Sequence, residues 1–265
     1  MQADSALPAA KPAGGKKDAM SEARTLVQAN PTRSTRRVMN ATQFQYPYAA
    51  TLTKNEVCTC IEDTGLIPAV NEVSIEDALF VADTLLDAGI PVLEISMNAP
   101  DAIEIISHVV KHAPATIVGG GSLRNAEAAR KCLDAGAKFL ATDGLIAGVV
   151  ELAAREKIVA VQGALTLTEV ISAWDAGADF VKVVPCYAVG GPNYIRTLKA
   201  ALLQARLIAA GGVNQVTAQN YIAAGAIGLS VSTELIPTEA ILLRQSRRIQ
   251  ELARRFLTAV DNGRE

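Results

Sequence analysis

From Thr64 onward, the hydrophobic positions alternate between two patterns. Short runs rich in β-branched residues predict strands near Leu66–Val70, Val92–Ser96, Thr116–Val118, Phe139–Thr142, Ile158–Val161, Phe180–Val184, Leu207–Ala209 and Ile227–Val231. Each run is followed by an amphipathic stretch of helical length, and these begin near Ser74, Pro100, Asn125, Ile146, Thr166, Pro192, Thr217 and Thr238. Eight strand–helix units in about 200 residues are typical of a (β/α)8 TIM barrel.

An internal repeat supports the barrel. Four helical stretches end in similar phrases, which are Leu86-Asp87-Ala88-Gly89, Leu133-Asp134-Ala135-Gly136, Trp174-Asp175-Ala176-Gly177 and Ile222-Ala223-Ala224-Gly225. Glycine just past a helix end can adopt the left-handed conformation that turns the chain into the next strand. The main alternative, a doubly wound open sheet, is disfavoured by the eight units and because Gly119-Gly120-Gly121 lacks the spacing of a dinucleotide fingerprint.

The first 50 residues differ from the rest in composition. They hold seven basic and three acidic residues and show little apolar periodicity. We therefore expect a largely disordered extension over residues 1–50 and a barrel over 51–265. The extension lacks the apolar core of a secretory signal, although its Arg/Ser character resembles a transit peptide. A short partner-binding segment around Ser21 to Gln28 is a further reading.

Composition narrows the partners. The chain of 265 residues has a formal net charge of −2, so we expect no nucleic-acid partner, and it has no apolar run of membrane-spanning length. Four cysteines in a chain of this size do not suggest disulfides and favour a cytoplasmic protein.

No metal site is predicted. Cys58 and Cys60 are spaced too tightly for a zinc knuckle and are predicted to belong to a short helix. The i, i+4 spacing of His108 and His112 on one helix could bind a metal, but no cysteine or carboxylate cluster accompanies them. We therefore expect an exposed helix face there.

Lys182 stands out among the ten lysines. It is the only one inside a predicted strand, between Val181 and Val183. Burial disfavours an ammonium, lowers its pKa and frees the amine as a nucleophile. The other reading is a lysine that reaches the barrel mouth with its charge in water.

Glu94 is the matching anomaly in the second strand. Alternation places Glu94 on the face of Val92 and Ser96, so it and Lys182 meet inside the barrel if both faces point inward. A structural ion pair is one reading. The functional one is a proton shuttle beside a Schiff-base lysine.

Two glycine-rich loops complete the candidate site. Gly211-Gly212 ends the seventh strand, and Ser232-Thr233 follows the eighth, where barrels usually bind phosphate. The run Gly119-Gly120-Gly121-Ser122 after the third strand offers backbone donors to a carboxylate or an oxyanion.

The motifs together resemble those of the 2-keto-3-deoxy-6-phosphogluconate aldolase family, from about Asn55 to Phe256. They are Leu93-Glu94-Ile95, Val118-Gly119-Gly120-Gly121-Ser122, Val181-Lys182-Val183-Val184-Pro185 and Ala210-Gly211-Gly212-Val213. Glu94 to Pro100 and Gly191-Pro192-Asn193-Tyr194-Ile195 look closer to the 6-phosphogalactonate branch.

The resemblance implies a homotrimer without metal or cofactor. By it, Lys182 forms the pyruvate Schiff base and Glu94 is the general acid/base. The loop Gly120 to Ser122 would hold the keto-acid carboxylate, and Gly211, Gly212 and Thr233 would line the distal pocket. Asn98 and Gln162 are further expected substrate contacts.

Several positions depart from the family pattern. Asn71 and Asn98 stand where the family and its gluconate branch have arginines, Gln162-Gly163 replaces Pro-Gly, and Ser122 and Ser232-Thr233 are milder changes. Without these two arginine side chains, the pocket lacks two bidentate partners for an anion, so phosphate recognition is expected to differ. The residues expected to carry the lyase reaction, Lys182 and Glu94, are retained.

The resemblance therefore implies a class I aldolase that cleaves a 2-keto-3-deoxy (6-phospho) sugar acid to pyruvate and an aldehyde such as glyceraldehyde 3-phosphate. Two alternatives are a barrel sugar-phosphate isomerase and a non-catalytic family member that acts as a scaffold through its tail.

Overall fold

The structure is a computed structural model and describes residues 48–71 and 73–265. Its strands, in chain order, are β1 (Leu66–Val70), β2 (Val92–Ser96), β3 (Ile117–Gly121), β4 (Phe139–Ala141), β5 (Val159–Ala164), β6 (Phe180–Val183), β7 (Leu207–Ala210) and β8 (Gly228–Val231). All neighbours pair in parallel, and β8 pairs with β1 to close the barrel. The predicted (β/α)8 fold is confirmed.

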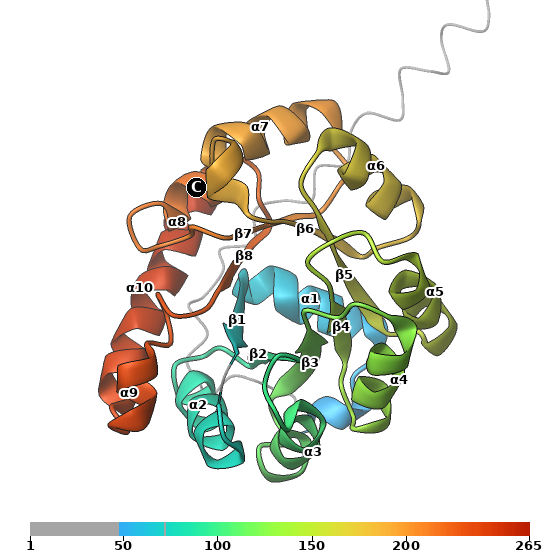
Figure 1. Ribbon diagram of the computed structural model, residues 1–265. Coiled ribbons are helices and arrows are strands. Elements are labelled where there is room, and N and C mark those ends of the chain that lie inside the picture. Colours follow the sequence, from blue (N-terminus) through green and yellow to red (C-terminus); the bar gives the residue numbers. More distant parts are fainter. Residues whose placement is uncertain (1–47, 72) are drawn as a thin grey trace, which may run out of the picture. The chain divides into compact units, whose positions relative to one another are not determined.

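The helices surround the closed sheet, except for α1, which lies across the middle of the barrel in the view of Figure 1. They are α1 (Lys54–Thr64), α2 (Ile75–Asp87), α3 (Ala102–His112), α4 (Ala126–Asp134), α5 (Ala147–Glu156), α6 (Leu167–Asp175), α7 (Pro192–Ala201), α8 (Ala218–Ala223), α9 (Thr238–Leu242) and α10 (Ser246–Arg264). Two 3-10 turns, η3 (Ala49–Thr51) and η4 (Cys186–Val189), complete the described elements.

Capping residues explain why several helices begin where the sequence predicts. Thr53, Ser74 and Thr166 each accept a hydrogen bond from the third residue of the helix they precede, and the acidic side chain of that third residue accepts one from the backbone N–H of the capping residue. Such capping boxes satisfy backbone donors that a helix start leaves unpaired.

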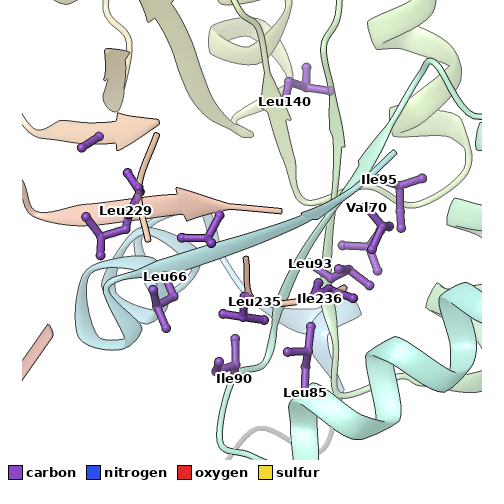
Figure 2. Close-up of a cluster of buried hydrophobic side chains, with 14 of the residues drawn as sticks. Leu66, Val70, Leu85, Ile90, Leu93, Ile95, Leu140, Leu229, Leu235 and Ile236 are labelled. Carbon is purple, nitrogen blue, oxygen red and sulfur yellow. The ribbon is translucent and has the colours of Figure 1, made fainter. Parts of the chain in front are cut away.

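Two apolar layers hold the barrel. Outward-facing strand residues pack against the helices, as the cluster around Leu66, Leu85 and Leu93 shows (Figure 2). Inside, Phe139 and Phe180 pack with smaller side chains, and α1 adds Val57 and Ile61 to this inner layer. Apolar side chains therefore fill the barrel interior near the amino ends of the strands. The interior polar groups lie toward the carboxyl ends.

The boundaries differ from the prediction in two informative places. The glycines 119–121 belong to β3, and Gln162 and Gly163 belong to β5, although the sequence places them in loops. Glycine is disfavoured in strands, but here its missing side chain is needed. A Cβ at Gly119 would lie 2.2 Å from the Phe139 ring.

The described part of the chain begins at residue 48, close to the expected start of the barrel at residue 51. Ala49 is buried and donates its N–H to Pro114 O at 2.7 Å, so the described chain contacts the barrel before residue 51. Residues 1–47, to which the predictions of a disordered extension and of a partner-binding segment apply, lie outside the described residues. No described helix is both long and apolar enough to cross a membrane.

The packing of Gly119 gives a stability prediction. We expect Gly119→Ala to lower the free energy of unfolding by about 1–3 kcal/mol, because the Phe139 ring has to move within a filled core. Urea denaturation measures the change.

Gly148→Ala is the matched control for this substitution. Gly148 lies in α5, and a Cβ on it would lie 3.5 Å from that of Ala126 in α4, which is an ordinary van der Waals contact. The control should hold or slightly raise stability. Equal stability of Gly119→Ala and wild type would contradict the packing argument.

Candidate active site

A pocket of about 470 Å³ lies at the carboxyl ends of the strands. Its lining residues come from β1, β2, β6, β7 and β8 and from the loops after β3 and β4, and they include Glu94, Ser122, Asp143, Lys182, Gly211, Gly212, Thr233 and Glu234. This is the end of the barrel at which active sites of this fold lie.

Lys182 lies in the middle of the barrel wall. Its neighbours across the sheet are Gly163 of β5 and Ile208 of β7. Val181 and Val183 pack outward under the helices, so alternation directs Lys182 into the interior. Its side chain is buried, with 3% of the residue exposed, and forms part of the pocket.

Glu94 meets Lys182 across the interior, as the alternation of β2 predicts. Its Oε1 atom lies 3.7 Å from Lys182 Nζ, and its Oε2 atom is buried without a hydrogen-bond partner among the described residues. Gly121 makes room for this carboxyl group, because a Cβ there would lie 1.8 Å from Oε1. Gly121, the last glycine of the run, is thus explained first by packing around Glu94.

Asp143 is a third charged group that the sequence reading missed. Its Oδ1 atom lies 2.7 Å from Lys182 Nζ, closer than Glu94, although 52% of the Asp143 side chain is exposed. A signal was present, because Asp143 directly follows the predicted fourth strand, where barrels place active-site residues.

The three groups shift one another's proton affinity. Burial raises the pKa of Glu94 more than the nearby Lys182 lowers it. For Asp143, burial acts upward, but the Lys182 ammonium and hydrogen bonding hold its pKa below the usual value. These shifts favour an Asp143 anion and a Lys182 cation, and they ease the protonation of Glu94.

The expected lowering of the Lys182 pKa is wrong in direction. Burial does lower it, but attraction to Glu94 and Asp143 outweighs burial, so the pKa of Lys182 is raised. Burial alone was considered at the sequence level, whereas the structure adds two carboxylates within 4 Å. The amine must lose a proton before it can act as a nucleophile.

The structure brings only some of the expected substrate contacts to the pocket. Ser122 lines it with a left-handed backbone (φ 55°). Gly120 faces the helices, because a Cβ there would lie 2.4 Å from Cys132 Sγ. Asn98 is exposed and, like Gln162, is absent from the lining; the Gln162 amide instead donates to Gly144 O at 2.8 Å.

The distal part of the pocket holds Gly211, Gly212 and Thr233, as expected. Both glycines have positive φ, and a Cβ at Gly212 would lie 2.4 Å from that of Tyr187, so a side chain does not fit. Asn71 donates to Ser232 Oγ at 3.2 Å, between the loops that follow the neighbouring strands β1 and β8. Among the described lining residues, Lys182 is the only cation.

Metal ligands do not gather in the described part of the chain, where no group of three or more His, Cys, Asp or Glu side chains could hold an ion. His108 and His112 lie on the exposed face of α3, and Cys58 and Cys60 lie in α1, as predicted.

The protein-family comparison matches residues 57–252 to the model described as KDPG and KHG aldolase. The chain belongs to the KDPG and KHG aldolase family. The matched residues include both Glu94 and Lys182, and membership makes the protein an aldolase, a carbon–carbon lyase.

Individual relatives agree with the family assignment. The KHG/KDPG aldolase of Escherichia coli K12 is 26% identical over 71% of this chain and 89% of its own. A probable 2-dehydro-3-deoxy-6-phosphogalactonate aldolase of Rhizobium meliloti is 30% identical over 64% of this chain and 81% of its own. A solved structure of native KDPGal is 26% identical, with a TM-score of 0.69, over 75% of this chain and 95% of the other.

Gly121 generates a prediction about this aldolase site. We expect Gly121→Ala to lower kcat by about 100-fold, because the added methyl group displaces the Glu94 carboxyl group, and misplacing a catalytic group by 1 Å has effects of that size. Steady-state kinetics measure the loss, and circular dichroism checks that the barrel is folded. Turnover within twofold of wild type would show that the position of Glu94 is unimportant.

Proposed function

We propose that this aldolase works through a Schiff base on Lys182 and cleaves a 2-keto-3-deoxy sugar acid to pyruvate and an aldehyde. Glyceraldehyde 3-phosphate is the aldehyde when the substrate carries a 6-phosphate. The observation that carries the proposal is the position of Lys182 Nζ, which is buried inside the barrel yet forms part of the pocket, 3.7 Å from Glu94.

The reaction needs one nucleophile and repeated proton transfer. The neutral Lys182 amine attacks the keto carbon, and the carbinolamine loses water to give an iminium. Removal of the proton from the C4 hydroxyl then breaks the C3–C4 bond and leaves an enamine. Glu94 is suited to these transfers because burial brings its carboxylic acid and carboxylate forms closer in free energy.

Substrate placement follows from the pocket. We propose that Ser122 lies along the keto-acid end, near Lys182, and that Gly211, Gly212 and Thr233 lie along the distal end. Gly121 supports the keto-acid end by leaving room for the Glu94 carboxyl group. We propose that Gly120, which faces Cys132, and Gln162, which donates to Gly144 O, support this surface from behind. Asn98 is absent from the pocket lining, so we assign it no substrate contact.

Phosphate recognition is the part in which this chain is unusual. Asn71 is already paired with Ser232, and the exposed carboxylate Glu234 joins the distal lining. A 6-phosphate would depend on backbone groups and hydroxyls without a cationic side chain among the described lining residues. We therefore propose that 2-keto-3-deoxy acids without a phosphate are substrates alongside the 6-phosphorylated ones.

A substrate panel tests this activity. Wild-type protein should release pyruvate from at least one 2-keto-3-deoxy acid in a set that varies the 6-phosphate and the C4 configuration. Lys182→Ala should abolish release, because no other described lysine lines the pocket. A lactate dehydrogenase-coupled assay measures both.

The controls separate the competing functions. Lys199→Ala removes a lysine from α7, outside this pocket, and should leave turnover unchanged. A sugar-phosphate isomerase would interconvert a sugar phosphate and release no pyruvate. A scaffold would do neither, so absence of pyruvate from the whole panel would contradict the proposal.

We also infer that the aldolase is a homotrimer in the cytoplasm. Leu167 and Ile171 are 41% and 39% exposed and share one face of α6, which leaves an apolar surface for a second copy. The four described cysteines are free thiols, as in a reducing compartment. Light scattering should give three times the chain mass of 27.8 kDa, and a monomer mass would contradict the assembly.

A further inference from the structure

Asp143 occupies a position that the reaction outlined above does not use. It lies two residues beyond the end of β4, in the loop that leads to α5. Its Oδ1 atom is the nearest carboxylate oxygen to Lys182 Nζ, at 2.7 Å against 3.7 Å for Glu94. The atom that Asp143 contacts is the one that would form the Schiff base.

The surrounding loop is built to hold Asp143 there. Gly163 is the β5 neighbour of Lys182, and a Cβ on it would lie 2.3 Å from the carbonyl carbon of Asp143. A glycine at this position thus lets the loop descend onto the barrel. The Thr142 hydroxyl accepts from Gly163 N–H at 2.9 Å and donates to Gly144 O at 2.8 Å.

Gln162 fastens the same loop from the outer side of β5. Its amide donates to Gly144 O at 2.8 Å, so two side chains anchor the residue next to Asp143. This contact gives Gln162 a role in positioning the loop, in place of the substrate contact expected from the sequence. Four hydrogen-bonding groups therefore fix the backbone around Asp143: the Thr142 hydroxyl, Gly144 O, the Gln162 amide and Gly163 N–H. The contact between Asp143 and Lys182 is thus a positioned one and not an incidental surface contact.

We propose that Asp143 is a catalytic residue of this aldolase: it holds the Lys182 ammonium in the empty site and then serves as the counter-ion of the iminium, while Glu94 moves the protons. This inference rests on the proposed Schiff-base function. It assigns different tasks to the two carboxylates that face one lysine.

The environments of the two carboxylates support this division. Glu94 is buried, and one of its oxygens lacks a described partner, so burial raises its pKa. Asp143 is half exposed, receives a hydrogen bond from Ser122 and lies in the field of Arg124, and together with Lys182 these keep its pKa low. A site whose carboxylates have pKa values pushed apart assigns proton transfer to one and fixed charge to the other.

The charge on nitrogen changes at each step. The ammonium first loses its proton to Glu94 or to water, and the neutral amine forms the new C–N bond. Loss of water from the carbinolamine then places a positive charge on the same nitrogen, beside Asp143. When the C3–C4 bond breaks, its electron pair moves to form the neutral enamine, and the C4 hydroxyl proton passes to Glu94. Asp143 gains and loses no proton throughout.

The test is Asp143→Asn, which keeps the size and an acceptor oxygen but removes the charge. Borohydride trapping of the pyruvate adduct is followed by intact mass at a series of pH values. Without the anion, the ammonium is easier to deprotonate, so the pH midpoint for trapping should fall by about one unit or more. At alkaline pH, where the amine is already neutral, half-maximal trapping should need about tenfold more pyruvate.

The lower pH midpoint makes trapping easier, whereas the higher pyruvate requirement makes it harder. A site that is merely damaged would not produce both effects. Asp143→Glu, which restores a carboxylate, should recover part of both. Asp175→Asn removes an exposed carboxylate at the end of α6, at the far end of the barrel from the pocket, and should change neither.

Two results would overturn the inference about Asp143. They are an unchanged pH midpoint in Asp143→Asn and an equal shift in Asp175→Asn. Absence of any adduct in the wild-type protein would instead refute the Schiff-base function itself, so the two failures are distinguishable.

Discussion

The structure depends on a buried ammonium that two carboxylates stabilise inside an apolar barrel. Moving a lysine cation out of water is costly, and Lys182 is 3% exposed between valines that face the helices. Glu94 and Asp143, at 3.7 and 2.7 Å, offset that cost. They also raise the pKa of the lysine, which stabilises the ammonium form that the proposed Schiff-base reaction must deprotonate.

Packing and chemistry share the same positions in this barrel. Gly121 leaves room for the Glu94 carboxyl group, and Gly163 lets the loop that carries Asp143 approach Lys182. Gly119 makes the corresponding room for Phe139 in the filled lower layer. Glycine destabilises an isolated strand. Each of these three glycines is nevertheless needed, because a side chain in its place would collide with the neighbouring group.

The sequence predicted the barrel because eight apolar runs and eight amphipathic stretches follow one another with little between them. It also predicted that Glu94 and Lys182 face each other, since strand alternation and barrel closure fix that geometry. The contact between Asp143 and Lys182 was not predicted, because it depends on the path of the loop after β4, and that path requires a glycine at position 163. The predicted direction of the Lys182 pKa shift is wrong for the same reason. The hydrogen bond of Gln162 to Gly144 O depends on that loop as well.

The most direct measurement of the central claim is the site of covalent attachment. The protein is incubated with pyruvate, reduced with borohydride, digested and mapped by mass spectrometry. The Schiff-base assignment predicts that one reductively linked pyruvate is found on the peptide containing Lys182 and that Lys182→Arg carries none. Attachment at another lysine, or an unmodified Lys182 peptide at saturating pyruvate, would contradict it.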